Sequence, residues 1–233
     1  MSATPAPALV SVIVRTLGRG TLVRALESVA AQTHRPIEIV LVDAVGRGIV
    51  MANHRGVPVR MVRGNRLDGV AAANAGLEAA QGEWLLFLDD DDQFAPGHVA
   101  DLLSAARSAG APAAYSQTQL VDPTGSPQRI FGGGPFNRSA LLASNYLAMH
   151  AVLFHRSFVE AGHRFDAAFP IFYDWDFWLQ LSQAKSFAFT GRPTAFYWAA
   201  SGESGGGEGP NLDREQALRM RERLIRKWGA SPG

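Results

Sequence analysis

The feature that most constrains this chain is an alternation of short apolar runs with helical patterns along its first ninety residues. The runs are rich in β-branched residues and have strand length, whereas the stretches between them carry apolar residues at helical spacing. The expected order is strand, helix, strand, strand, helix, strand, at Leu9 to Val14, Thr21 to Gln32, Ile37 to Val42, Val57 to Val62, Val70 to Ala80 and Trp84 to Leu88. This order predicts an α/β fold in which a mostly parallel, twisted sheet is covered by helices on both faces.

The second half of the chain is less regular. It predicts a helix from Pro96 to about Ala109, strands at Ala113 to Gln117 and Ala151 to Phe154, and an exposed hairpin or loop at Pro123 to Gly134. A helix from Asp174 to Ala184 is expected to bury one face, formed by Trp175, Trp178, Leu179 and Ser182.

Composition excludes several classes of protein. The 22 basic and 21 acidic residues leave a formal net charge of +1, which gives no general electrostatic reason to bind nucleic acid. The absence of Cys excludes disulfides, thiolate metal sites and cysteine nucleophiles. Neither a signal peptide nor an apolar run of membrane-spanning length is present, so we expect a cytoplasmic location.

Four consecutive carboxylates, Asp89 to Asp92, follow directly on an apolar strand. Ligand crevices of open α/β sheets lie beyond the carboxyl ends of the strands, and repulsion among these carboxylates favours a neutralising cation there. Hard oxygen ligands suit Mg²⁺ or Mn²⁺, although a solvated acidic turn has the same sequence. A calcium hand is excluded, because Phe94 stands where its loop needs Gly and Ala100 where it needs Glu.

Three further carboxylates are candidates for chemistry. Asp43 ends the second strand, where it is either a turn former or an acceptor for a nucleobase imide or ribose hydroxyl. Asp174 and Asp176 flank Trp175 at a helix start, where Asp is favoured as a cap and where an ionised carboxylate is also able to accept a proton. Phosphate-loop, dinucleotide-turn and zinc-hydrolase motifs are all missing, which disfavours those enzyme classes.

Several stretches, in this order and at these spacings, resemble the family 2 glycosyltransferases, which have the GT-A fold. They are VSVIVRT, LVRALESVAAQTHRPIEIVLVD, GVAAANAGLEAAQGEWLLFLDDDD and FYDWDFWLQL, within about Leu9 to Trp198. The resemblance implies that Asp89 to Asp91 form the D-x-D motif, with Asp91 on the Mg²⁺ or Mn²⁺ ion, and that Asp174 is the catalytic base. The residues implied to hold the nucleotide are Thr16, Asp43, Asn74, Asp89 and Asp90. We expect acceptor contacts from Trp175, Asp176 and His150.

The same resemblance suggests how the chain is divided. Residues 1–8 are expected to be a disordered extension, and residues 9–200 a GT-A domain with a nucleotide-sugar-binding half (9–117) and an acceptor-side half (118–200). Residues 201–210 form a flexible Gly-rich loop with the composition of either a lid or a linker. Residues 211–233 are expected to form an amphipathic helix whose apolar side is Ala217, Leu218, Leu224, Ile225 and Trp228. Its excess of basic residues suits either peripheral contact with the inner face of a membrane or docking on the domain.

The function implied by the resemblance is an inverting, metal-dependent transfer of a single sugar from a nucleoside-diphosphate sugar. UDP- or dTDP-sugars are the favoured donors, and the acceptor hydroxyl belongs to a sugar, a lipid-linked molecule or another glycoconjugate precursor. The chain departs from the family at four positions, with Arg15 for Pro, Ala44 for an acid, Ala73 for Arg and Tyr173 for Glu. These departures keep a non-catalytic nucleotide-sugar-binding relative open as an alternative. A sugar nucleotidyltransferase is a third reading, disfavoured because no Gly-rich basic loop follows the first strand.

Overall fold

The computed structural model describes residues 7–183, 185–198 and 213–229. Its strands are β1 (Val10–Thr16), β2 (Ile37–Asp43), β3 (Asn53–His54), β4 (Val57–Arg63), β5 (Trp84–Asp89), β6 (Gln93–Phe94), β7 (Ala113–Val121), β8 (Pro127–Phe131), β9 (Val152–His155) and β10 (Ala188–Trp198). Its helices are α1 (Leu22–Ala30), α2 (Gly69–Ala79), α3 (His98–Ala109), α4 (Arg138–Ala143), α5 (Ser157–Glu160), α6 (Tyr173–Leu181) and α7 (Arg214–Trp228), with a 3-10 turn at Met149–Ala151. The extension predicted for residues 1–8 falls outside this description except for its last two residues, and the predicted Gly-rich loop at 201–210 falls outside it entirely.

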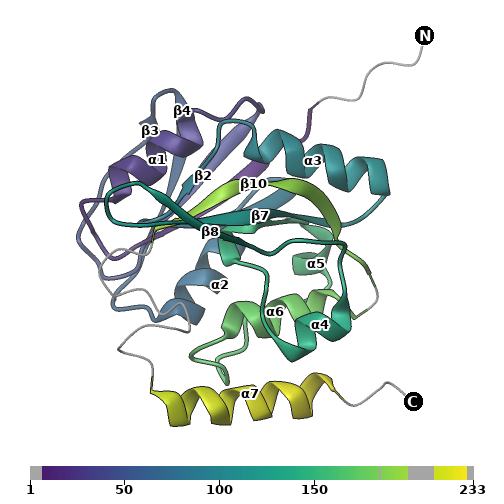
Figure 1. Cartoon of the computed structure of the whole chain (residues 1–233). Helices are drawn as coiled ribbons and strands as arrows, with labels where there is room; N and C mark the ends of the chain where they lie inside the picture. The colour runs from purple at the N-terminus through teal and green to yellow at the C-terminus, as the bar shows by residue number, and fades with distance from the viewer. Residues whose placement is uncertain (1–6, 184, 199–212, 230–233) are drawn as a thin grey trace.

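The strands form one mixed sheet in the order β3-β4-β2-β1-β5-β9-β7-β10-β6, with β8 added to β7 (Figure 1). β4, β2, β1 and β5 are parallel neighbours, while β9 runs antiparallel between β5 and β7. β10 is again parallel to β7. The predicted α/β sheet is therefore confirmed as a mixed sheet with a parallel central part. β3, β6, β8 and β9 pair antiparallel with their neighbours.

The central strands bring the candidate residues to one edge of the sheet. All seven residues of β1 and of β2 are buried, as expected for strands covered on both faces. In the sheet register, Arg15 pairs with Asp89 of β5, and Thr16 pairs with Asp43 of β2. The ends of β1, β2 and β5 therefore lie side by side, although Arg15 and Asp89 are 74 positions apart in the sequence.

Helices cover both faces of the sheet (Figure 1). α1 and α3 pack on one face through buried residues that include Leu26 and Leu102, at the spacing that the sequence predicts. α2, α4 and α6 pack on the opposite face, and α7 lies beneath α4 and α6 as an outer layer. Two buried cores, one on each side of the sheet, therefore hold the strands rigidly in place.

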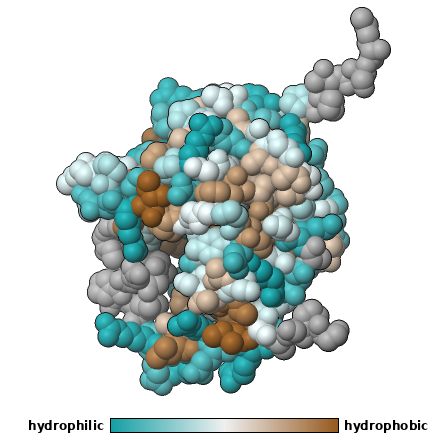
Figure 2. All heavy atoms as spheres, turned by 45° about the vertical axis from the view of Figure 1, so that its right-hand side comes forward, coloured by the Kyte–Doolittle hydropathy of each residue, from teal (hydrophilic) through white to brown (hydrophobic). Residues whose placement is uncertain are grey.

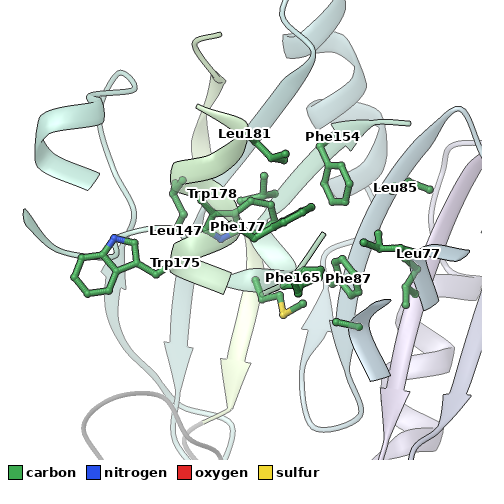
Figure 3. Close-up of a cluster of buried hydrophobic side chains, with 14 of the residues drawn as sticks. Leu77, Leu85, Phe87, Leu147, Phe154, Phe165, Trp175, Phe177, Trp178 and Leu181 are labelled. Carbon is green, nitrogen blue, oxygen red and sulfur yellow. The ribbon is translucent and has the colours of Figure 1, made fainter. Parts of the chain in front are cut away.

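α6 lies deep in the second of these cores (Figure 3). Phe177 and Trp178 contact Phe154 of β9 ring to ring, and Phe177 stacks on Phe165 with ring centroids 4.1 Å apart. The residues that we predict to be buried on this helix are confirmed, and they are Trp175, Trp178, Leu179 and Ser182. Asp176, Phe177 and Leu181 are buried as well, so α6 is enclosed on more than one face.

The sequence did not predict the long strand β10, but it did predict the exposed hairpin that contains β8. β10 interrupts its pairing with β7 around Pro193 and contains Gly191 at a positive φ, two residues that weaken a strand pattern in the sequence. Tertiary pairing with β7 nevertheless holds β10 in the sheet. The Pro- and Gly-rich stretch from Pro123 to Gly134 contains β8, which forms an exposed hairpin with β7.

α7 docks on the domain through Leu224, which is fully buried, and through Met220 and Trp228. The predicted apolar side is too wide, because Leu218 and Ile225 are 60% and 43% exposed. Figure 2 shows hydrophobic atoms among hydrophilic ones at the lower edge of the molecule, where α7 runs. Peripheral membrane contact through this helix stays a prediction. Among the helices of the described residues, none combines the length and the apolar character needed to cross a bilayer.

The packing of α2 on the sheet depends on Gly76. A Cβ atom at this position would lie 2.3 Å from Cγ2 of Ile13 and 3.3 Å from Cγ2 of Val42. We expect Gly76→Ala to lower the free energy of unfolding by about 1–3 kcal/mol, because overpacking outweighs the helix propensity gained. Urea denaturation measures the change, with Gly20→Ala as the control, since a Cβ at Gly20 meets no atom within 4 Å. A Gly76→Ala protein as stable as the wild type would contradict this packing.

Candidate functional site

A pocket of about 240 Å³ opens at the carboxyl ends of β1 and β5, where ligands of open α/β sheets bind. Its lining residues come from β1 and the following loop, from the end of β2, from the start of α2, from the acidic turn after β5 and from the start of α6. They are Arg15, Thr16, Leu17, Arg19, Ala44, Leu67, Asp68, Gly69, Ala72, Asp89, Asp90, Asp91 and Tyr173. A larger cavity of about 490 Å³ lies at the amino ends of β1, β2 and β4, away from the acidic turn. The chemistry-bearing side chains single out the smaller pocket.

The acidic turn predicted to need a positive partner has one in Arg15. The Nε and Nη2 atoms of Arg15 donate to Oδ1 of Asp89 at 2.9 and 2.6 Å, and its Nη1 donates to the Tyr173 hydroxyl at 2.9 Å. Arg15 is 8% exposed, and burial alone would lower its pKa. The charge of Asp89 and the hydrogen bond with Tyr173 outweigh that cost and raise the pKa of Arg15, so the guanidinium stays charged.

A second arginine lies on the other side of the turn. Nη1 of Arg19 donates to Oδ1 of Asp90 at 2.9 Å and to Oδ2 of Asp91 at 3.0 Å. Asp90, which is buried, also accepts hydrogen bonds from the Thr16 hydroxyl at 2.6 Å and from the backbone N–H of Leu17 at 2.9 Å. Asp90 and Thr16 therefore fix the end of β1 to the acidic turn.

The last carboxylate of the turn faces the protein interior. Oδ1 of Asp92 accepts the backbone N–H of Trp198 at 3.2 Å, and its Oδ2 lies 3.2 Å from Nδ1 of His150. Burial, followed by the charges of Asp91 and Asp89, raises the pKa of Asp92 well above its ordinary value, and burial lowers the pKa of His150 to about 4. His150, a predicted acceptor contact, thus lies behind the acidic turn and not among the residues that line the pocket. Its acceptor role stays a prediction.

The carboxylates that line the pocket suit a divalent cation. Asp89 and Asp91 each use one oxygen for an arginine, and within the described part of the chain Oδ2 of Asp89 and Oδ1 of Asp91 make no hydrogen bond. Burial and then the charge of Asp89 raise the pKa of Asp91, against the opposing effect of Arg19, so a further cation would relieve unfavourable charge. Mg²⁺ commonly takes one or two carboxylates together with substrate phosphates. The described residues contain no ready-made cluster of three or more metal-binding side chains.

The start of α6 forms the opposite wall of the pocket. Phe172 precedes the helix with φ at 61°, a left-handed conformation that costs a bulky residue about 1–2 kcal/mol. This turn leads into Tyr173, whose hydroxyl contacts Arg15. The predicted capping role of Asp174 and Asp176 is wrong, because the cap position belongs to Phe172 and both carboxylates lie inside the first turn.

Asp174, the predicted base, follows directly on the pocket-lining Tyr173. Nδ2 of Asn145 donates to its Oδ2 at 3.0 Å. Burial raises the pKa of Asp174 above the ordinary value, although the N–H of Trp175, Asn145 and the charge of Arg15 oppose the shift. The positive end of a helix favours an ionised carboxylate, but burial outweighs that effect here. A raised pKa makes Asp174 a stronger base than an exposed aspartate.

Asp43 organises a loop in this structure. Its Oδ1 accepts the backbone N–H groups of Gly46 and Arg47, both at 3.0 Å, and its Oδ2 accepts those of Gly48 and Ile49 at 2.9 and 3.4 Å. Burial raises the pKa of Asp43, but these four amides together lower it below the ordinary value. Its oxygens are therefore engaged by backbone, and the nucleoside contact predicted for Asp43 stays a prediction.

Asn74 joins two segments of the fold. Its side-chain amide donates to the carbonyl of Phe165 at 2.9 Å and accepts the N–H of the same residue at 3.0 Å. This pairing ties α2 to the segment before α6, which positions the helix that carries Asp174. Asn74 does not line the pocket, and its nucleotide contact stays a prediction.

The two predicted acceptor residues on α6 have partners in the protein interior. Trp175 is 4% exposed, and its indole N–H donates to the Leu141 carbonyl. Figure 3 shows its ring at the margin of the buried cluster, apart from Phe177 and Trp178. Asp176 is fully buried and binds α7, with Lys227 at 2.8 Å and the Trp228 indole N–H at 2.7 Å. Neither residue lines the pocket, so their acceptor roles stay predictions.

In the sequence, Thr16 was marked as a nucleotide ligand by the family resemblance and Arg15 only as a departure from the family, and Arg19 had no predicted role. Arg15 and Tyr173, two of the departures from the family, turn out to be hydrogen-bonded partners across the pocket. Arg15 follows directly on the apolar run Leu9 to Val14, and a charged residue at that place is a signal that could have found it. No local signal marked Arg19, because its partners lie more than 70 residues away.

Comparison with known sequences identifies the family. The family described as Glycosyl transferase family 2 matches residues 11–130, more than half of the chain. An uncharacterized glycosyltransferase of Bacillus subtilis (strain 168), YwdF, is 28% identical over 94% of this chain and 84% of its own length. The succinoglycan biosynthesis protein ExoO of Rhizobium meliloti (strain 1021) is 32% identical over 65% of this chain, which spans only 43% of ExoO.

Solved structures agree on the fold. TarS of S. aureus (residues 1–349), in complex with UDP-GlcNAc, superposes with a TM-score of 0.66 at 16% identity, covering 94% of this chain and 71% of that one. The longer TarS structure gives a TM-score of 0.64 over 94% of this chain but only 39% of its own length. The mixed sheet with helices on both faces is thus of the GT-A type. With this architecture and the match over residues 11–130, the chain belongs to glycosyl transferase family 2.

Proposed function

We propose that this protein transfers a single sugar, with inversion at the anomeric carbon, from a UDP- or dTDP-sugar to an acceptor hydroxyl. The observation that carries the proposal is a pocket with the carboxylates Asp89 to Asp91 on one wall and Tyr173, next to Asp174, on the other. Relatives include a protein of succinoglycan biosynthesis, and the structural neighbour TarS has been crystallised with UDP and UDP-GlcNAc. These likenesses favour a UDP-sugar donor and an acceptor from polysaccharide or glycoconjugate synthesis.

In the proposed reaction, the acceptor oxygen attacks the anomeric carbon on the face opposite the leaving group. Asp174 takes the proton from the acceptor hydroxyl as the new C–O bond forms. The bond between the anomeric carbon and the donor phosphate oxygen breaks, and the nucleoside diphosphate leaves with the bonding electrons. The first turn of α2 opens onto the same pocket through Gly69 and Ala72, and a helix amino end favours the negative charge of the phosphates.

A bound Mg²⁺ or Mn²⁺ would neutralise charge that develops on the leaving diphosphate. Asp91, together with the free oxygen of Asp89, would hold it, and Arg15 keeps that oxygen of Asp89 free by binding the other. Asn145 orients the carboxylate of Asp174.

The test is to incubate the purified protein with a panel of UDP- and dTDP-sugars, with Mn²⁺ or Mg²⁺, and to measure release of the nucleoside diphosphate. Release from one donor, and a product whose anomeric configuration by NMR is opposite to that of the donor, would support the proposal. Nucleotide binding without release from any donor would favour the non-catalytic relative. A product that retains the donor configuration would contradict the inverting mechanism.

The raised pKa of Asp174 predicts the pH dependence of turnover. The base must be unprotonated, so the turnover number falls as the pH drops through the pKa of Asp174. Because burial raises that pKa, the acid limb should lie above pH 3.8, the ordinary value for aspartate. The measurement is the turnover number against pH with saturating donor, acceptor and cation. An acid limb at or below pH 3.8 would exclude Asp174 in this buried state as the group that titrates.

A further inference from the structure

The charges around the pocket raise the question of which side chain meets the donor diphosphate. Of the described residues that line the pocket, only Arg15 and Arg19 are basic. Arg15 already uses all three guanidinium nitrogens, two on Asp89 and one on the Tyr173 hydroxyl and the Gly69 carbonyl. It has no remaining edge for a phosphate and acts as a structural cation.

Arg19 is bound differently. Only its Nη1 is engaged, on Asp90 and Asp91, and within the described residues Nε and Nη2 of Arg19 make no hydrogen bond. These two N–H groups form one edge of the planar guanidinium, the arrangement that binds two phosphate oxygens at once. The Arg19 side chain is 23% exposed, so this residue combines free donors with access to the pocket.

The backbone beneath Arg19 is fixed before any ligand arrives. The N–H of Leu17 donates to Asp90 at 2.9 Å, and the N–H of Gly18 donates to the Thr16 hydroxyl at 2.8 Å. Gly18 adopts a φ of 74°, which turns the chain sharply at the end of β1. A residue whose backbone and Nη1 atom are already held loses less entropy when it binds a ligand.

We propose that Arg19 is a ligand of the donor diphosphate, which it binds through Nε and Nη2 while Nη1 remains on Asp90 and Asp91. This inference rests on the proposed function and adds a residue to the same site. The guanidinium then lies between the acidic turn and the phosphates, so its charge compensates both. Arg19 complements a cation on Asp91 and does not replace it.

Isothermal titration calorimetry at saturating Mn²⁺ tests this role with UDP and with inorganic pyrophosphate as ligands. We expect Arg19→Gln to weaken the binding of both by about 10- to 100-fold, because a charge-assisted bidentate contact is lost. Arg19→Lys, which keeps the charge but not the planar edge, should lie between Arg19→Gln and the wild type. Arg55→Gln is the matched control, since it removes the same charge from an exposed pair with Glu27 and should bind like the wild type.

A second titration, with Mn²⁺ alone, separates a ligand from a structural support. If Arg19 binds the phosphates, Arg19→Gln should bind Mn²⁺ as tightly as the wild type or more tightly, because a positive charge next to Asp91 is gone. If Arg19→Gln loses both Mn²⁺ and UDP binding, Arg19 only shapes the acidic turn and the proposal is overturned. It is also overturned if Arg19→Gln binds UDP and pyrophosphate with affinities within twofold of the wild type. A wild-type protein that binds neither UDP nor pyrophosphate would overturn the proposed function as well. If the wild-type protein binds UDP and pyrophosphate, Arg19→Gln weakens that binding, and the wild type transfers no sugar from any donor, the role of Arg19 would stand and the proposed sugar transfer would be refuted.

Discussion

Asp174→Asn should lower the turnover number by about 10²- to 10⁴-fold while donor affinity stays close to that of the wild type. Asparagine preserves the size of the side chain and is still able to pair with Asn145, but it does not accept a proton at neutral pH. Because Asp174 lies in the first turn of α6 and is not among the pocket-lining residues, the donor contacts should survive. Steady-state kinetics with a saturating donor, together with calorimetric titration of UDP, measures both quantities.

The control for this variant is Asp101→Asn. Asp101 also lies in the first turn of a helix, α3, and pairs with Arg192 on the far surface, so its loss should leave turnover unchanged. Wild-type turnover in Asp174→Asn would mean that another group accepts the proton. A loss of UDP binding equal to the loss of turnover would mean that Asp174 supports the donor site and not the proton transfer.

Asp91→Asn should raise the Mn²⁺ concentration needed for half-maximal activity by at least about tenfold and lower catalytic efficiency by about 10²-fold. Asp91 lines the pocket, and its Oδ1 makes no hydrogen bond within the described residues, so it is the side chain best placed to bind the ion. A neutral amide is a weaker ligand for a hard divalent cation than a carboxylate. The measurement is nucleoside diphosphate release as a function of Mn²⁺ concentration, after treatment with EDTA.

Glu78→Gln, which removes one exposed carboxylate from α2, is the charge-matched control and should retain the Mn²⁺ dependence of the wild type. For the wild type, EDTA should abolish release, and added Mn²⁺ or Mg²⁺ should restore it. Full activity of the wild-type protein in EDTA would reject metal dependence. If Asp91→Asn needs the same Mn²⁺ concentration as the wild type, a residue other than Asp91 binds the ion.

Much of the candidate site was predictable from the sequence, because its residues lie at the carboxyl ends of predicted strands. Asp89 to Asp91 and Thr16 come directly after or at the end of buried apolar strands, and parallel strands place their carboxyl ends at one edge of the sheet. Assigning β1 and β5 correctly was therefore enough to predict that these residues lie close together. The position of Asp174 rested on its resemblance to a family motif, because no periodicity indicates that the start of α6 meets the end of β1.

Other features were decided by packing between distant segments. The sequence offered Asp43, Asn74 and Asp176 as polar groups, and the fold engages each of them with backbone or with α7. The pKa of Asp174 is raised because burial among neighbouring elements outweighs the favourable helix start. Local sequence carries no information about how deeply a side chain will be buried by residues far along the chain.

The order of apolar runs and helical stretches by itself determined the α/β architecture. The spacing of apolar residues within each strand or helix depends only on the sequence of that element. Only the tertiary structure decided the pairing of charges, in which Arg15 and Arg19 meet carboxylates more than 70 residues away. It also decided that β10 is a strand and that Phe172 adopts a left-handed turn. These features depend on contacts between residues far apart in the sequence, which exist only when the sheet and both helical layers have assembled.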